Sequence, residues 1–228
     1  MADKPCPHLV APLTTPSLLG DAYFPARATL QEIFGSPSDA AAVGLALSQT
    51  QLNCSKPLFW VQEDKVLKTA GRVFTHGLPR TLRRPVLHVA ARNARDVLWA
   101  MEEGLKCSAL GAVIGELYGN PRALDFTASR RLAVAAERYG TPAFLIRTDA
   151  QADLSGARRR WRAESRPSLR HPYDSRAPGM PAWSLDLFRA RDMRPGRSEV
   201  AYDNATHRVD MVSGPSDGAL AQGASRYG

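Results

Sequence analysis

Cysteine is scarce in this chain of 228 residues, and the placement of the few that occur excludes two kinds of site. Cys6, Cys54 and Cys107 are odd in number and widely spaced. They therefore predict neither a disulfide framework nor a CxxC metal site. We expect a reducing, cytoplasmic environment, no metal and no catalytic cysteine.

Long apolar runs are also missing. No stretch approaches the roughly 18 apolar residues that a membrane-spanning helix needs. The first residues, MADKPCPHLVAPLTTPSLLG, lack the basic start and apolar block of a secretory signal. With 44% apolar residues the chain can still bury a core, so we expect a globular protein that has no membrane partner.

Negative charge is in deficit. The formal net charge is +8 and the isoelectric point is near 9.8, which favours an anionic partner, nucleic acid first. Lysine is rare, and between Gly156 and Arg197 eleven arginines accompany four acids and no lysine. Arginine suits phosphate and carboxylate pairing, and it also serves in protein interfaces.

Apolar segments and helical patterns alternate through the first two thirds of the chain. Strands are predicted near 30–35, 57–62, 85–90, 109–117 and 142–147, and helices at 39–50, 93–106 and 127–139. Asn93 and Asp96 form a capping box, Thr127 is the predicted cap of the last helix, and Gly140 ends it. This alternation predicts an α/β fold with a mostly parallel sheet flanked by helices.

The pattern changes after Arg147. An arginine-rich and proline-rich loop is expected there, followed by a strand at WSLDLFRA and two strands joined at Asp203-Asn204. These strands predict antiparallel additions at the C-terminal end of the sheet.

The loop after the first strand has the position of a phosphate-binding loop but not its chemistry. Gly35, Ser36, Pro37, Ser38 and Asp39 stand where a functional loop needs GxxxxGK[ST]. No lysine is in frame, Pro37 lacks an amide donor, and Asp39 adds negative charge. From spacing alone, an ordinary strand-to-helix turn is the favoured interpretation; in either case we expect no nucleotide cofactor.

The order of elements resembles the RecA-like fold, in which a strand like LQEIFG leads into the phosphate loop. That resemblance implies that Glu63 and Glu116, at the ends of PLFWVQE and GAVIGE, are relics of a catalytic and a magnesium-binding acid. More closely, LQEIFG, VLWAMEEGL, LDFTASRRLAVAAE and PAWSLDLFRARDMRPG resemble the ImuA family, RecA-like and SulA-like proteins of the bacterial inducible-mutagenesis cassette.

The resemblance covers about residues 28–212, and together with the composition of the two ends it divides the chain into four segments. These are a poorly ordered lead-in (1–25), a degenerate RecA-like core (26–150), an arginine-rich loop with an antiparallel extension (151–212) and a disordered tail (213–228). It also implies a non-catalytic adaptor in SOS-induced translesion synthesis after DNA damage. The implied partners are ImuB (a polymerase-like protein), RecA and an error-prone relative of the polymerase III alpha subunit, with single-stranded DNA as a further candidate.

The arginine segment is the predicted binding surface for DNA or a partner. Its members are Arg158, Arg159, Arg160, Trp161, Arg162, Arg166, Arg170 and Arg176. Arginines can neutralise phosphates, and Trp161, Tyr173 and Trp183 could stack on bases. The alternative is that the arginines face solvent and the aromatics lie in the core. Two other functions stay open: a SulA-like inhibitor of cell division, and an active DNA-dependent ATPase.

Overall fold

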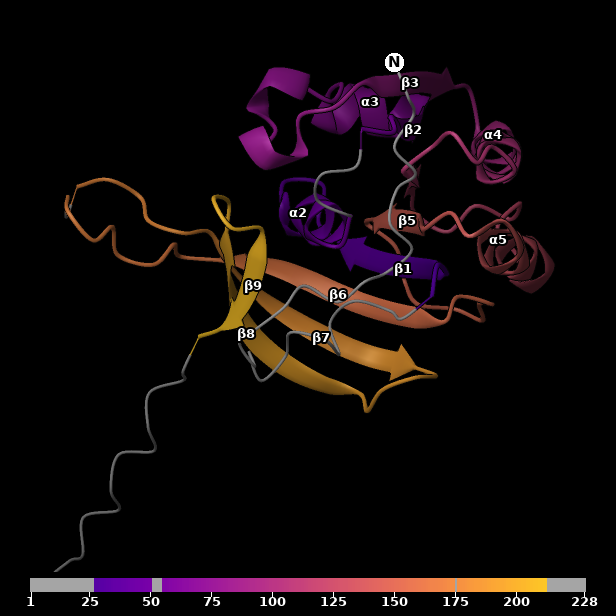
Figure 1. Ribbon diagram of the computed structural model, residues 1–228. Helices are drawn as coiled ribbons and strands as arrows, with labels where there is room; N and C mark the ends of the chain where they lie inside the picture. Colours follow the sequence, from indigo (N-terminus) through magenta and orange to yellow (C-terminus); the bar gives the residue numbers. More distant parts are fainter. Residues whose placement is uncertain (1–26, 51–54, 175, 213–228) are drawn as a thin grey trace, which may run out of the picture.

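The computed structural model describes residues 27–50, 55–174 and 176–212, so the predictions for 1–25 and 213–228 lie outside the described residues. Within these ranges the strands form one nine-stranded sheet in the order β3-β2-β4-β5-β1-β6-β7-β8-β9 (Figure 1). The strands are β1 Leu30–Gly35, β2 Leu58–Glu63, β3 Val86–Ala91, β4 Ala112–Tyr118, β5 Ala143–Thr148, β6 Arg159–Arg166, β7 Ala182–Ala190, β8 Gly196–Asp203 and β9 Arg208–Met211.

The sheet has a parallel part and an antiparallel part. From β3 to β6 every neighbouring pair is parallel, whereas β6–β7, β7–β8 and β8–β9 pair antiparallel. The central strand β4 is apolar and buried along almost its whole length, as a parallel strand covered on both faces must be. The predicted fold class, a mostly parallel α/β sheet with antiparallel strands appended at the C-terminal end, is confirmed.

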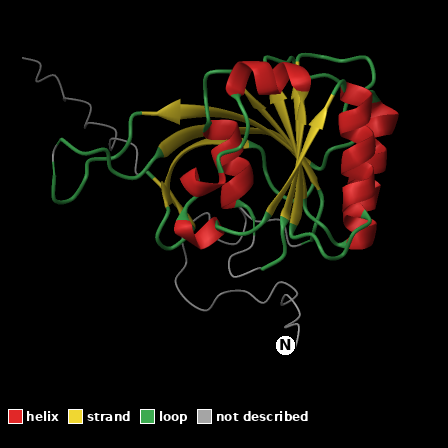
Figure 2. Cartoon of the chain, turned by 90° about the horizontal axis from the view of Figure 1, so that it is seen from above, coloured by secondary structure: helices red, strands yellow, loops and turns green. Residues whose placement is uncertain are grey.

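Helices cover both faces of the parallel part (Figure 2). On one face, α4 and α5 share an apolar cluster with Val113 and Leu145. On the other face, Leu45 of α2 packs in a second cluster with Ile33 and Phe144. The helices are α2 Ala41–Ser48, α3 Asp64–Ala70, α4 Ala94–Leu105 and α5 Phe126–Tyr139, and two 3₁₀ turns span Thr75–Gly77 and Arg80–Leu82. The short helix α3 had no counterpart in the sequence pattern.

The helix ends test the capping predictions. The Asn93 side chain accepts a hydrogen bond from the Asp96 amide at 3.1 Å, which confirms the predicted cap of α4. The predicted cap Thr127 is wrong, because the Asp125 carboxylate accepts from the Ala128 amide at 2.7 Å and α5 starts at Phe126. Gly140 ends α5 in the left-handed region, at φ 69°, as predicted.

The arginine-rich stretch is not a loop over its first half. Residues 159–166 form β6, which pairs with β1 on one side and β7 on the other. The alternation is present in the sequence, since Trp161 and Ala163 are buried while Arg162 and Glu164 are exposed. Arginine at the buried positions 159 and 160 concealed it, because arginine is rarely fully buried unless it is paired. Only residues 167–181 form a connection without a regular strand.

Candidate functional site: the carboxyl edge of the sheet and the arginine segment

The loop after β1 ends in Asp39, whose carboxylate binds α2 and β6. Asp39 Oδ1 accepts a hydrogen bond from the Ala41 amide, the first residue of α2, at 2.8 Å, and Asp39 Oδ2 accepts from the Ser165 amide of β6 at 2.8 Å. The Ser165 hydroxyl donates to Asp39 as well. Amides at a helix N-terminus are the donors that would otherwise receive a phosphate. Here the Ala41 amide already has an anionic acceptor.

The ionisation of Asp39 agrees with this arrangement. Burial favours the protonated acid, yet the hydrogen bonds from Ser165 and Ala41 outweigh it and lower the pKa of Asp39 below its ordinary value. The loop also lies directly on α2, since a Cβ added to Gly35 would meet the Ala42 Cβ at 2.9 Å. The five predicted loop residues therefore form a tight turn from β1 into α2. They are Gly35, Ser36, Pro37, Ser38 and Asp39.

The two predicted acids lie in different surroundings. Glu63 is the last residue of β2, and its carboxylate accepts from the Tyr118 amide at 2.9 Å. The sequence suggested that Glu116 ends its strand. In the structure β4 continues past it to Tyr118. Glu116 lies within the sheet, 4% exposed, and accepts from the Trp60 indole. Burial raises the pKa of Glu116 to about 6, although hydrogen bonds from Trp60 and Gln62 oppose the shift.

Internal contacts also occupy the carboxyl edge beside these acids. The Tyr118 hydroxyl donates to Asp149 at 2.6 Å, which raises the pKa of Tyr118, and Lys65 Nζ lies 3.7 Å from the centre of the Tyr118 ring. Asp149 adopts φ 53°, and its amide donates to the Gly35 carbonyl. Within the described ranges, no three His, Cys, Asp or Glu residues are grouped so that they could hold a metal ion.

The arginines of the predicted binding surface are paired with acids from neighbouring elements. Arg159 binds Asp192 at 2.6 Å and Arg160 binds Glu32 at 2.6 Å, and both guanidinium groups are buried. The remaining contacts are Arg158 with Glu137, Arg162 with Asp186 at 3.3 Å and Arg166 with Glu199 at 3.6 Å. Trp161 is buried and donates to Gln31 at 2.9 Å. Four of these six residues stabilise the sheet from buried or half-buried positions, and only Arg162 and Arg166 extend to the surface.

Glu32 is the centre of a buried charge cluster. Its carboxylate, with no exposed surface, binds Arg147 of β5 at 2.7 Å and Arg160 of β6 at 2.6 Å. Asp153 lies 3.9 and 4.0 Å from the same two arginines. The strands β5, β1 and β6 are neighbours in the sheet, so the cluster joins the parallel core to the extension. Sequence reasoning quoted Glu32 only as part of a motif and missed this role.

Two predicted arginines do lie on an exposed projection. Arg170 and Arg176 belong to the connection 167–181, which extends away from the sheet (Figure 1). At its base the Leu169 amide donates to the Met180 carbonyl and the Gly179 amide donates to the Leu169 carbonyl, and Tyr173 near its tip is 93% exposed. We call residues 167–181 the β6–β7 projection. Together with Arg162 and Arg166, its arginines are the exposed members of the predicted surface.

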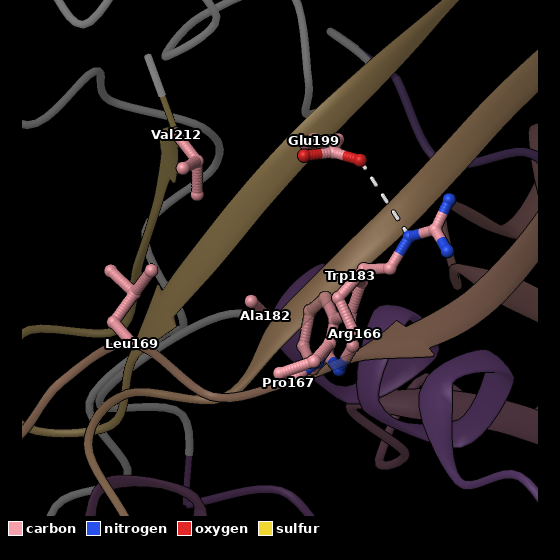
Figure 3. A pocket seen from close by; sticks show the side chains of 7 residues that line it. All are labelled: Arg166, Pro167, Leu169, Ala182, Trp183, Glu199 and Val212. Carbon is pink, nitrogen blue, oxygen red and sulfur yellow. Dashed lines mark ion pairs between the residues drawn. The ribbon is translucent and has the colours of Figure 1, made fainter. Parts of the chain in front are cut away.

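A shallow pocket lies at the base of this projection (Figure 3). It has a volume of about 400 Å³, and the Arg166–Glu199 ion pair crosses its rim. Trp183 forms its floor, but this side chain is 94% buried and stacks on Tyr202 at 5.5 Å. Trp183 and Trp161 are therefore core residues, and Tyr173 alone of the three predicted stacking aromatics is exposed. The lining residues are Arg166, Pro167, Leu169, Ala182, Trp183, Glu199 and Val212.

The fold and this edge define an α/β protein with a mostly parallel sheet, in which the Asp39 carboxylate binds the first amide of the helix that follows the first strand. No family model matches the sequence. The chain is similar to two curated proteins, each called Protein ImuA, from Caulobacter vibrioides strains NA1000/CB15N and ATCC 19089/CB 15. Each is 27% identical over 158 residues, which cover 63% of this chain and 63% of the relative.

This similarity confirms the resemblance to the ImuA family that the sequence motifs carry. The chain spans about 63% of the length of these relatives. Within the part of the chain that the structure describes, no helix combines the length and apolar character that crossing a bilayer requires.

Proposed function

We propose that this protein is an ImuA-like accessory factor of a bacterial inducible-mutagenesis cassette, acting by binding rather than by catalysis. The similarity to Protein ImuA over 158 residues supports the link to the cassette. The non-catalytic role rests on one observation: the carboxylate of Asp39 occupies the α2 amide that a nucleotide phosphate would need. A triphosphate in this loop would meet a fixed negative charge and no lysine in frame, so ATP hydrolysis is disfavoured.

The proposed partners are ImuB, RecA and the error-prone relative of the polymerase III alpha subunit, in the cytoplasm of a cell responding to DNA damage. The β6–β7 projection is the proposed contact. It carries an exposed tyrosine between two exposed arginines, Tyr173 between Arg170 and Arg176. Tyrosine and arginine are the residue types that most often dominate the binding energy of protein interfaces.

Affinity capture of ImuB and RecA by the full-length chain tests this proposal. The variant Arg170→Glu/Tyr173→Ala/Arg176→Glu alters the projection without touching the sheet. Its control, Arg191→Glu/Arg194→Glu, reverses two exposed arginines in the turn between β7 and β8. We expect the projection variant to lose capture about 10-fold or more, as when interface anchors are removed, and the control to retain it. Equal recovery of both partners by the two variants would contradict the role of the projection.

A chain truncated after residue 150 would not test the projection alone. It would remove β6, which pairs with β1 and supplies Arg160 to the buried Glu32.

Function in the cell provides a second readout: loss of the gene should lower damage-induced mutation frequency, and its expression should leave cell division intact. Filamentation on expression would favour the SulA-like alternative. DNA-stimulated ATP hydrolysis that disappears on substituting Glu116 would favour the ATPase.

A further inference from the structure

A second concentration of positive charge lies outside the arginine segment. Between Lys65 and Arg95 there are eight lysines and arginines and no aspartate or glutamate. The chain has 30 Lys and Arg and 22 Asp and Glu, so removing these eight cations leaves 22 of each sign. This acid-free segment alone therefore carries eight positive charges, and the rest of the chain has equal numbers of each sign. Scanning for runs without acids, rather than for dense arginine, would have found it.

The fold collects this charge at one end of the sheet. The segment runs from α3 through the two 3₁₀ turns and β3 into α4, and Figure 1 shows these elements together around the edge strand β3. Seven of the eight side chains are exposed and the eighth is half-buried. We call this group the β3-edge surface; its exposed members are Lys65, Lys68, Arg72, Arg80, Arg83, Arg92 and Arg95.

Most of this charge is not neutralised internally. Among the described residues, no carboxylate oxygen lies within 4.0 Å of Arg72, Arg80, Arg92 or Arg95. The arginines of β6 are different, since each binds an acid of a neighbouring element. His88 on β3 reports the local field: burial, and then the positive charge of Arg72, lower the pKa of the His88 imidazole.

Large exposed aromatic side chains accompany the cations. Trp99 is 64% exposed and lies four residues after Arg95, so both project from the outer face of α4. Phe74 is 71% exposed, and its ring centre lies 5.5 Å from that of His76. Unpaired cations interleaved with exposed rings are the pattern by which proteins hold single-stranded nucleic acid, through phosphate contacts and base stacking.

We propose that the β3-edge surface binds single-stranded nucleic acid, with the phosphates on Arg72, Arg92 and Arg95 and bases stacked on Trp99. This site differs from the arginine segment that the sequence suggested, and it does not depend on the proposed protein partners. The alternative is that the cations only protect β3 from pairing with another chain, as charges at sheet edges commonly do. In that case no anion would bind there with useful affinity.

Fluorescence anisotropy with the full-length protein and a labelled oligodeoxythymidine tests the proposal. The variant Arg72→Gln/Arg92→Gln/Arg95→Gln removes three charges from the β3-edge surface. The matched control, Arg162→Gln/Arg166→Gln/Arg197→Gln, removes three charges from the exposed ion pairs with Asp186 and Glu199. A phosphate contact on a single strand contributes about 0.7 to the salt slope, or roughly 4-fold in affinity near 0.15 M salt.

We therefore expect the edge variant to bind roughly 50-fold more weakly, with a salt slope smaller by about 2, and the control to stay within about 2-fold of the unmodified protein. Trp99→Ala should weaken binding about 5-fold or more through lost stacking. The proposal fails if the unmodified protein binds no oligonucleotide at low salt, or if the two triple variants lose affinity equally. It also fails if the edge variant binds the oligonucleotide as tightly as the unmodified protein does and loses only its binding to an acidic protein. Circular dichroism of each variant checks that the fold is retained.

Discussion

Replacing Glu116 by glutamine should make this protein more stable at neutral pH. The carboxyl group is 4% exposed, and burial raises its pKa from 4.5 to about 6. The folded protein therefore holds the proton more tightly than the unfolded chain, and ionisation lowers the stability as the pH rises from 4.5 through 6. Glutamine keeps an oxygen that can accept from the Trp60 indole but carries no charge.

The magnitude follows from the size of this shift. A difference of about 1.5 pKa units corresponds to roughly 2 kcal/mol, and almost all of it applies at pH 7. At about pH 5 the carboxyl is mostly protonated in the folded state, and the expected gain falls to about 0.8 kcal/mol. Urea denaturation at the two pH values measures both, as a higher midpoint with an unchanged slope.

Glu63→Gln is the matched control and should act in the opposite direction. Its carboxylate accepts a charge-assisted hydrogen bond from the Tyr118 amide at the strand end, so the substitution should lower stability by about 1 kcal/mol. If Glu116→Gln lowers the stability at pH 7, or raises it equally at pH 5 and pH 7, the reasoning from burial is refuted. A requirement for the Glu116 charge in any ATP-dependent activity would also speak against its assignment as a relic.

Three further predictions concern the core, the loop and the C-terminal hairpin. Glu32→Gln should lower the free energy of unfolding by about 3–5 kcal/mol, because it leaves Arg147 and Arg160 buried without their acid; an effect below about 1 kcal/mol in chemical denaturation would contradict this. Asp39→Ala should cost about 0.5–2 kcal/mol through the lost contact with the α2 amide. Calorimetry should detect no ATP binding by the unmodified protein, and micromolar binding by it would overturn the proposed non-catalytic role. His207 donates to the Thr50 carbonyl through Nε2 and accepts from the Tyr202 hydroxyl, and burial, assisted by Arg84, lowers its pKa. The unfolded chain therefore binds the proton first, so the stability difference between the protein and a His207→Gln variant should shrink as the pH drops below about 6.5. A difference that does not change with pH would show that His207 is not held neutral.

The sequence alone predicted the parallel core well. Apolar segments such as AVIGELY and PAFLIR alternate with amphipathic helices, and burying those faces leaves few arrangements other than a sheet between two helical layers. Local chemistry fixed several helix ends too, as at Asn93 and Gly140. It failed at Thr127, because Asp125, two residues earlier, makes the stronger cap, and two neighbouring cap residues cannot be ranked without the backbone.

The candidate sites were predicted only in part. The loop residues Gly35–Asp39 were identified by what they lack, but nothing local showed that Asp39 would bind Ser165, 126 positions away. Arg158, Arg159 and Arg160 looked like a phosphate surface because their acids, Glu137, Asp192 and Glu32, lie far away in the sequence. A count of charges along the chain cannot tell a paired arginine from a free one.

Hydrophobic periodicity and capping chemistry are short-range, and the amino-acid sequence by itself therefore determined which elements form and that they build an α/β protein. The tertiary structure decided which charges meet. It placed the acids of β1, α5 and the β7–β8 turn beside Arg160, Arg158 and Arg159, and it left most of the cations around β3 without carboxylates. Ion pairing depends on distances of a few ångströms between residues that are remote in sequence, and only the folded chain sets those distances.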